Sequence, residues 1–125
     1  MTKRQEGLRY EIKALANDSA EIRIYGDVAS YAWGEETTTA AQFVKDLAAI
    51  TASTIVLRIN SAGGSVPDGL AIYNALKRHA ATIDVHIDGW ALSIASLIAM
   101  AGDTVTMAEN ALFMVHAPWM SAYGN

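Results

Sequence analysis

The sequence predicts an α/β fold with a largely parallel central sheet. From Thr54 onward, segments with strand character alternate with segments at helical spacing, in the order strand, helix, strand, helix, strand. This alternation requires crossover connections, which pair strands in parallel and place helices against the sheet. The chain has 125 residues and is 52% hydrophobic, which is enough for one domain with its own core. We therefore expect a single domain over residues 1–125.

The N-terminal segment is predicted to form a hairpin. Apolar and charged residues alternate from Leu8 to Ala14, as in a half-buried strand. The turn-forming run 17–19 then leads to a returning strand that contains Ile22 and Ile24. The hairpin should span about residues 8–25.

A helix should follow the three threonines 37–39. Their hydroxyl groups can accept hydrogen bonds from the free N–H groups of a first helical turn. Apolar residues then recur at helical spacing from Phe43, and the pattern ends near Thr51.

Residues 54–80 read as strand, loop and helix. Thr54–Asn60 is a β-branched run of the kind found in strands that are buried on both faces. The glycine-rich loop 61–65 follows it. Pro67 and Asp68 then suit a first helical turn, because that turn tolerates a missing N–H and favours negative charge.

The remaining elements are shorter. Apolar residues alternate with polar ones over 83–87, which predicts a strand that closes at Gly89. Small residues from Ser93 to about Met100 indicate a helix, and 112–115 forms the last clear strand.

Composition excludes several classes of function. Nine basic and thirteen acidic residues give a net charge of -4 without long charge runs, so neither nucleic acid nor an anionic membrane is an expected partner. The absence of cysteine excludes disulfides and a thiol nucleophile, and fits a cytoplasmic protein. No apolar run approaches the roughly 20 residues of a membrane span.

Ser93 is the candidate nucleophile. It follows the strand that closes at Gly89 and begins a helix, where free N–H groups and a partial positive charge suit developing negative charge. A serine in this place is also a common helix N-cap, and local sequence favours that interpretation. Ser96 would lie inside the helix and is the weaker candidate.

The Gly63-Gly64 pair also allows two interpretations. Two glycines after a strand often form only a tight turn. The functional alternative is an oxyanion hole made of the Gly64 N–H and the N–H of Ile94, the residue after the serine. A phosphate loop is disfavoured because no lysine follows the glycines.

His116 is the candidate general base. It follows the last strand, and active-site groups of α/β folds gather at strand ends. A partly buried structural histidine is the alternative. His79 is expected to be solvated at a helix end and His86 to alternate along a strand, so the three histidines form no metal-ligand motif. Lys77 lies on a different predicted helix from Ser93, which argues against a serine–lysine pair.

Four segments together resemble the ClpP-type serine proteases of the crotonase-like superfamily. Residues 59–66 and 69–76 are similar to the family's glycine pair and its following helix. Residues 89–96 resemble its nucleophile segment, and 114–118 resemble its base segment. The serine-to-histidine order and their 23-residue separation also agree with the family pattern.

The resemblance implies a ClpP/crotonase-like fold of repeated β-β-α units. A protease of this kind is expected to use no cofactor and no metal. The resemblance also implies that Ser93 is the nucleophile and His116 the base, with the N–H groups of Gly64 and Ile94 as the oxyanion hole. A substrate peptide would add as an extended strand along Gly64, Ser65 and Val66, with Gly63 also lining the subsite, and the side of Pro118 and Trp119 would form the opposite wall.

Within the family, segments 24–27, 33–34 and 119–125 are most similar to phage and prophage ClpP-like proteases associated with head maturation. That similarity implies a homo-oligomeric ring in the full-length protein and a peptide or protein substrate, with phage capsid proteins as candidate partners. It also implies a place in the bacterial host cytoplasm or the phage prohead.

The chain departs from the family pattern at three points. Ala62 replaces a proline before the glycine pair, and Leu92 stands where a smaller residue is usual. The family's triad aspartate follows a long assembly helix, and the chain ends at Asn125 before either, with neither Asp88 nor Asp103 at the matching position. The resemblance therefore implies a core fragment.

Two other interpretations stay open: an inactive assembly or scaffold domain, and an acyl-CoA hydratase or isomerase of the same fold.

Overall fold

The computed structural model describes residues 2–4, 10–29 and 37–115, and these build a main sheet with helices packed against it and a small second sheet. Within these residues the main sheet has seven strands. They are β1 (Thr2–Arg4), β2 (Tyr10–Leu15), β3 (Ser19–Tyr25), β6 (Thr54–Ser61), β7 (Thr82–Leu92), β8 (Thr104–Met107) and β9 (Leu112–Met114). A second, two-stranded sheet pairs β4 (Asp27–Ala29) with β5 (Thr37–Thr39).

The order of the strands confirms the predicted α/β class with a largely parallel sheet. β3, β6, β7 and β8 lie side by side in parallel, and β9 also pairs in parallel with the far end of β7. Among the described strands, antiparallel pairing is confined to the N-terminal part: β2 forms a hairpin with β3, and β1 pairs with β2. The carboxyl ends of β6 and β7 therefore meet at one edge, where the glycine loop and Ser93 follow them.

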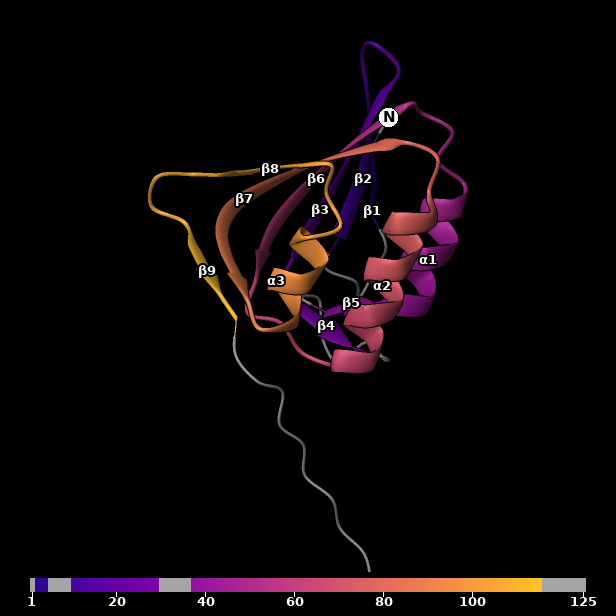
Figure 1. Cartoon of the computed structure of the whole chain (residues 1–125). Coiled ribbons are helices and arrows are strands. Elements are labelled where there is room, and N and C mark those ends of the chain that lie inside the picture. Colours follow the sequence, from indigo (N-terminus) through magenta and orange to yellow (C-terminus); the bar gives the residue numbers. More distant parts are fainter. Residues whose placement is uncertain (1, 5–9, 30–36, 116–125) are drawn as a thin grey trace, which may run out of the picture.

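Three helices lie on one side of the sheet, as Figure 1 shows: α1 (Ala40–Ala48), α2 (Val66–Arg78) and α3 (Ile94–Ala99). The sheet residues that face them are fully buried, Ile22 on β3 and Ile59 on β6 among them. From the helices, Phe43 and Ile72 join the same hydrophobic core. The opposite sheet face carries charged residues, because side chains alternate along each strand.

Helix starts differ in how they are capped. Ser65 caps α2 by accepting a hydrogen bond from the Asp68 N–H at 3.5 Å. Thr39 is the N-cap of α1 but makes no side-chain cap hydrogen bond, so the predicted capping does not come from its hydroxyl. Residues 37–39 form the strand β5 instead, and their extended backbone pairs with β4.

Two strands differ from the sequence prediction. β7 does not close at Gly89 but continues to Leu92, because β9 gives its last three residues a pairing partner. β8 was not predicted at all, since Thr-Val-Thr-Met is short and all four residues are exposed. Its pairing with β7 holds it in the sheet.

Candidate active site

The loop after β6 holds Gly64 so that its N–H points away from the strand β4. Val28 of β4 donates its N–H to the Gly63 carbonyl at 3.0 Å and accepts the Ser65 N–H at 2.9 Å. Both neighbours of Gly64 thus point toward β4, and hydrogen-bonding groups alternate in direction along extended backbone. Gly64 therefore presents its own N–H on the opposite side, where no acceptor exists among the described residues.

Both glycines are required by the geometry. Gly63 has φ +102, and a Cβ there would lie 2.8 Å from the Leu92 carbonyl oxygen and 3.0 Å from Ser93 Cβ. Gly64 has φ +145, and a Cβ there would lie 2.1 Å from the Val28 carbonyl oxygen. The glycine pair is more than a tight turn, because it brings the loop against the residue predicted to be the nucleophile.

Ser93 has a strained backbone of the kind found at functional turns. Its φ of 55 and ψ of -127 lie in a region that favours glycine, at a cost of about 1–3 kcal/mol. Ser93 stands at the N-cap position of α3 but makes no side-chain cap hydrogen bond. Ser93 as a residue is half-buried, and because its side chain makes no cap hydrogen bond, the N-cap explanation of this serine loses its physical basis.

Ile94 supplies the second predicted donor. It is the first residue of α3, so its N–H has no partner within the helix. Its side chain packs against Gly69 of α2, where an added Cβ would lie 2.1 Å from Ile94 Cγ1. A Cβ on Gly63 would lie 3.3 Å from the Ile94 nitrogen, so the loop that carries Gly64 passes close to this donor.

A bulge in β7 brings Ser93 to this place. Ile59 pairs with Ile87, but the next pairing joins Ser61 to Ala91, so β7 carries extra residues opposite Asn60. The Asn60 side chain occupies the bulge and accepts the Trp90 N–H at 2.9 Å. Extra residues in one strand bend it, which redirects the end of β7 toward the glycine loop.

β9 passes directly beside Ser93. Met114 pairs with Leu92, and the Met114 carbonyl accepts the Ser93 N–H at 3.0 Å. The described chain thus leaves the sheet at Val115, next to Ser93. The predicted base His116 and the predicted wall residues Pro118 and Trp119 lie outside the described residues.

A charged cluster on the outer sheet face escaped the sequence prediction. Asp88 accepts the Tyr25 hydroxyl at 2.6 Å and pairs with Arg58 at 2.8 Å, and Arg58 also pairs with Glu21 at 2.9 Å. Burial, followed by the hydrogen bond and charge of Asp88, raises the pKa of Tyr25 to about 12. The only indication in the sequence was that polar residues alternate with apolar ones along each of the three strands.

The other histidines have structural contacts. His79 does not stand in solvent as predicted: it is half-buried, its Nε2 lies 3.1 Å from the Leu47 carbonyl and 3.0 Å from the Ile50 carbonyl, and its Nδ1 accepts the Ala81 N–H. His86 alternates along β7 and lies 3.1 Å from Asp84. In the parts of the chain that the structure describes, no group of three or more acidic or histidine residues could bind a metal.

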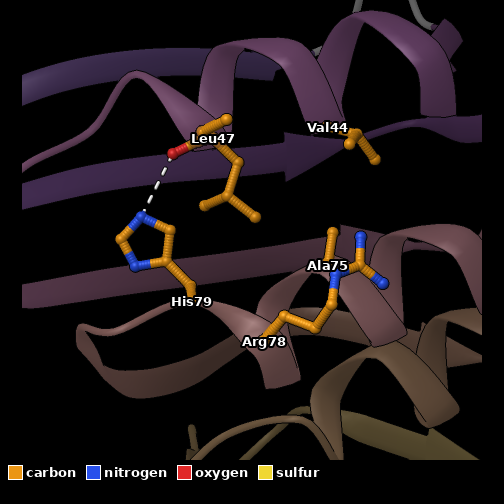
Figure 2. A pocket seen from close by; sticks show the side chains of 6 residues that line it. Val44, Leu47, Ala75, Arg78 and His79 are labelled. Carbon is orange, nitrogen blue, oxygen red and sulfur yellow. Dashed lines mark hydrogen bonds between the residues drawn. The ribbon is translucent and has the colours of Figure 1, made fainter.

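A shallow pocket lies between α1 and α2, away from Ser93, and Figure 2 shows His79 at its edge with the hydrogen bond to Leu47. It is lined by Val44, Leu47, Ala48, Ala75, Arg78 and His79. None of these residues belongs to the predicted site. Among the described helices, none is long and apolar enough to cross a membrane.

The fold and the site define an α/β protein with a serine at a strained strand-to-helix turn, facing a glycine loop. The Clp protease family model matches residues 6–125 of the chain. The chain therefore belongs to the Clp protease family.

Two relatives show the extent of the match. The ATP-dependent Clp protease proteolytic subunit of Ligilactobacillus salivarius is 39% identical over 72 residues, which cover 56% of this chain and 36% of that protein. A ClpP1 point mutant from Listeria monocytogenes has a similar structure, with a TM-score of 0.68 and 27% identity. That match covers 78% of this chain and 56% of the ClpP1 chain, so only part of either relative's length is represented.

Proposed function

We propose that this chain is the core of a ClpP-like serine endopeptidase that works without ATP and uses Ser93 as its nucleophile. The observation that carries the proposal is the geometry of Ser93. Its backbone is strained, its side chain does not cap α3, and Gly63 approaches it too closely for any side chain at that position. Strain of this kind persists where the surrounding structure imposes it, and it concentrates at functional sites.

The reaction begins with attack of the Ser93 hydroxyl oxygen on a peptide carbonyl carbon, while His116 accepts the hydroxyl proton. The carbonyl oxygen becomes an oxyanion that accepts hydrogen bonds from the N–H groups of Gly64 and Ile94. The intermediate collapses, the C–N bond breaks, and the leaving amine takes the proton from His116. Water then takes the place of the amine. His116 accepts a proton from the water, whose oxygen attacks the acyl carbon, and the Ser93 oxygen leaves and recovers its proton from His116.

The substrate would add as an extended strand along residues 64–66. The loop binds β4 through Gly63 and Ser65, which leaves the side carrying the Gly64 N–H for a peptide. Gly63, Ser65 and Val66 form the described part of this subsite, and we propose Pro118 and Trp119 as its opposite wall.

The two aspartates weighed for the triad, Asp88 and Asp103, have structural partners. Asp88 is bound by Tyr25 and Arg58, and Asp103 accepts the Ile83 N–H at 2.8 Å. These contacts support the expectation that neither acts as the triad acid, and neither is proposed for that role.

A fluorophosphonate probe tests the proposal, because it reacts with an activated serine. We expect labelling of the wild-type chain, none of Ser93→Ala, and slower labelling of His116→Ala. Ser53→Ala is a matched control, since Ser53 is exposed and its hydroxyl bonds only the Asp18 carbonyl. Undiminished labelling of Ser93→Ala, or a folded wild-type chain that never labels, would contradict the assignment.

We further propose that the protein acts as a homo-oligomer in phage head maturation, in the host cytoplasm or the prohead. The phage-like segments support the maturation role. Exposed apolar residues on β8 and β9, Met107 and Phe113 among them, support assembly. Co-expression with phage head proteins tests the substrate, because processing should occur with the wild type and not with Ser93→Ala.

A further inference from the structure

We infer that Ser96 is a positioning residue that fixes and polarises the peptide group between Ser93 and Ile94, so that the Ile94 N–H serves as an oxyanion donor. The inference rests on the proposed peptidase function. Ser96 was the weaker nucleophile candidate in the sequence because it was expected inside the helix, and the structure places it there. It lies inside α3, is 3% exposed, and its hydroxyl faces the backbone of Ser93 rather than solvent.

The Ser93 carbonyl oxygen receives two hydrogen bonds from Ser96. The hydroxyl donates at 2.5 Å, and the backbone N–H donates at 3.0 Å. Serines inside helices often bond a carbonyl three or four residues earlier, so the bond type alone is ordinary. Its acceptor is not ordinary, because this carbonyl belongs to a residue with φ 55.

The Ser93 carbonyl and the Ile94 N–H belong to one planar peptide group. A bond that fixes the direction of the carbonyl therefore fixes the direction of the N–H at the other end. Hydrogen bonds in a chain also polarise one another, so a carbonyl that accepts a short bond makes its own amide N–H a stronger donor. Ser96 thus acts on the donor without touching the substrate.

Other contacts restrain the atoms on either side of this peptide group. The Ser93 N–H donates to the Met114 carbonyl at 3.0 Å, and the Ile94 side chain packs against Gly69. These contacts restrain the neighbouring atoms, whereas among the described residues only Ser96 bonds the Ser93 carbonyl oxygen through a side chain. Loss of its hydroxyl should therefore change the donor more than it changes the fold.

The first measurement is the second-order rate of fluorophosphonate labelling. Loss of a complete oxyanion donor slows catalysis about 100- to 1000-fold, so loss of its support should cost less, roughly 5- to 30-fold in Ser96→Ala. Ser96→Cys keeps the volume but donates weakly, so it should label as slowly as Ser96→Ala. Ser96→Thr keeps the hydroxyl and should recover most of the rate. Ile98→Val is the matched control, because it loosens the buried face of the same helix without touching Ser93.

The second measurement is the amide nitrogen resonance of Ile94, which responds to a hydrogen bond on the preceding carbonyl. Ser96→Ala should shift it upfield by more than any other amide of α3, while Ile98→Val and Ser96→Thr should leave it near its wild-type position. Equal labelling rates in wild type and Ser96→Ala, or an unchanged Ile94 resonance, would overturn the inference. A folded wild-type chain that never labels would instead overturn the peptidase proposal, and the resonance would still report whether Ser96 holds the peptide group.

Discussion

Two neighbouring glycines serve different parts of the site. Gly63 allows the loop to approach the Ser93 side chain, while Gly64 allows the backbone to pass the Val28 carbonyl and leaves its own N–H without an acceptor among the described residues. Their φ values of +102 and +145 are costly for any other residue. The same two positions therefore determine both loop stability and the proposed oxyanion hole.

Gly64→Ala should lower the free energy of unfolding and abolish probe labelling. The backbone strain costs at least about 1–3 kcal/mol, and the contact between the new Cβ and the Val28 carbonyl adds to it. Urea unfolding measures the stability. Ala62→Gly is the control: it lies in the same loop, is exposed, and should cost no more than about 1 kcal/mol. Wild-type stability and labelling in Gly64→Ala would contradict the described loop geometry.

Between elements, a charged cluster connects three strands of the sheet. Tyr25 on β3, Arg58 on β6 and Asp88 on β7 are joined by hydrogen bonds of 2.6 and 2.8 Å. Asp88 immediately precedes the bulge that contains Gly89 and Trp90, so the cluster fixes β7 just before it bends toward Ser93. The alternation of each strand predicted polar residues on this face, but not which of them would meet.

Asp88→Asn should lower the pKa of Tyr25 from about 12 toward its ordinary value of 10.0. The substitution removes the carboxylate charge and weakens the hydrogen bond, while burial, the largest cause, remains. The expected pKa therefore falls between these two values. Phenolate absorbance during an alkaline titration measures it, and Glu109→Gln removes one exposed charge as a control.

The raised pKa of Tyr25 also predicts how the stability of the fold depends on pH. Because the folded pKa of Tyr25 is raised, the folded chain keeps a proton that the unfolded chain loses above pH 10.0. This stabilisation is complete below pH 10.0 and disappears as the pH rises to about 12. Tyr25→Phe should therefore flatten the loss of stability over that interval, and an unchanged alkaline profile would contradict the role given to this phenol.

At the scale of the whole molecule, one hydrophobic core joins the sheet and the three helices. Ile59 lies on the central strand β6, is fully buried, and stands beside Ile24 of β3 and Ile87 of β7 in register. Strands and helices that share one core should unfold together.

Ile59→Ala should cost about 2–5 kcal/mol of unfolding free energy, because it removes buried methyl groups and leaves a cavity. Val105→Ala, on the exposed strand β8, should cost roughly 0.5 kcal/mol or less. Urea unfolding followed by tryptophan fluorescence and by circular dichroism should give coincident transitions. Separate transitions for the two signals would show that the sheet and helices do not form one cooperative unit.

The sequence by itself determined the features that depend on local pattern. The alternation after Thr54 predicted the parallel sheet, and the positions of the glycine pair and of Ser93 at element ends predicted where the site would form. The strand pairing confirms the sheet, because periodicity acts over a few residues, whereas the position of the site stays a prediction.

Only the tertiary structure decided how the site is held. The pairing of Val28 with the Gly64 loop, the approach of Met114 to Ser93 and the contact of Asp88 with Tyr25 join residues far apart in the chain. The Ser96 bond spans three residues, yet its meaning depends on the strained turn at Ser93, which the packing of the glycine loop and β9 imposes. Long-range contacts of this kind leave no periodic signal, so their residues look ordinary until the fold brings them together.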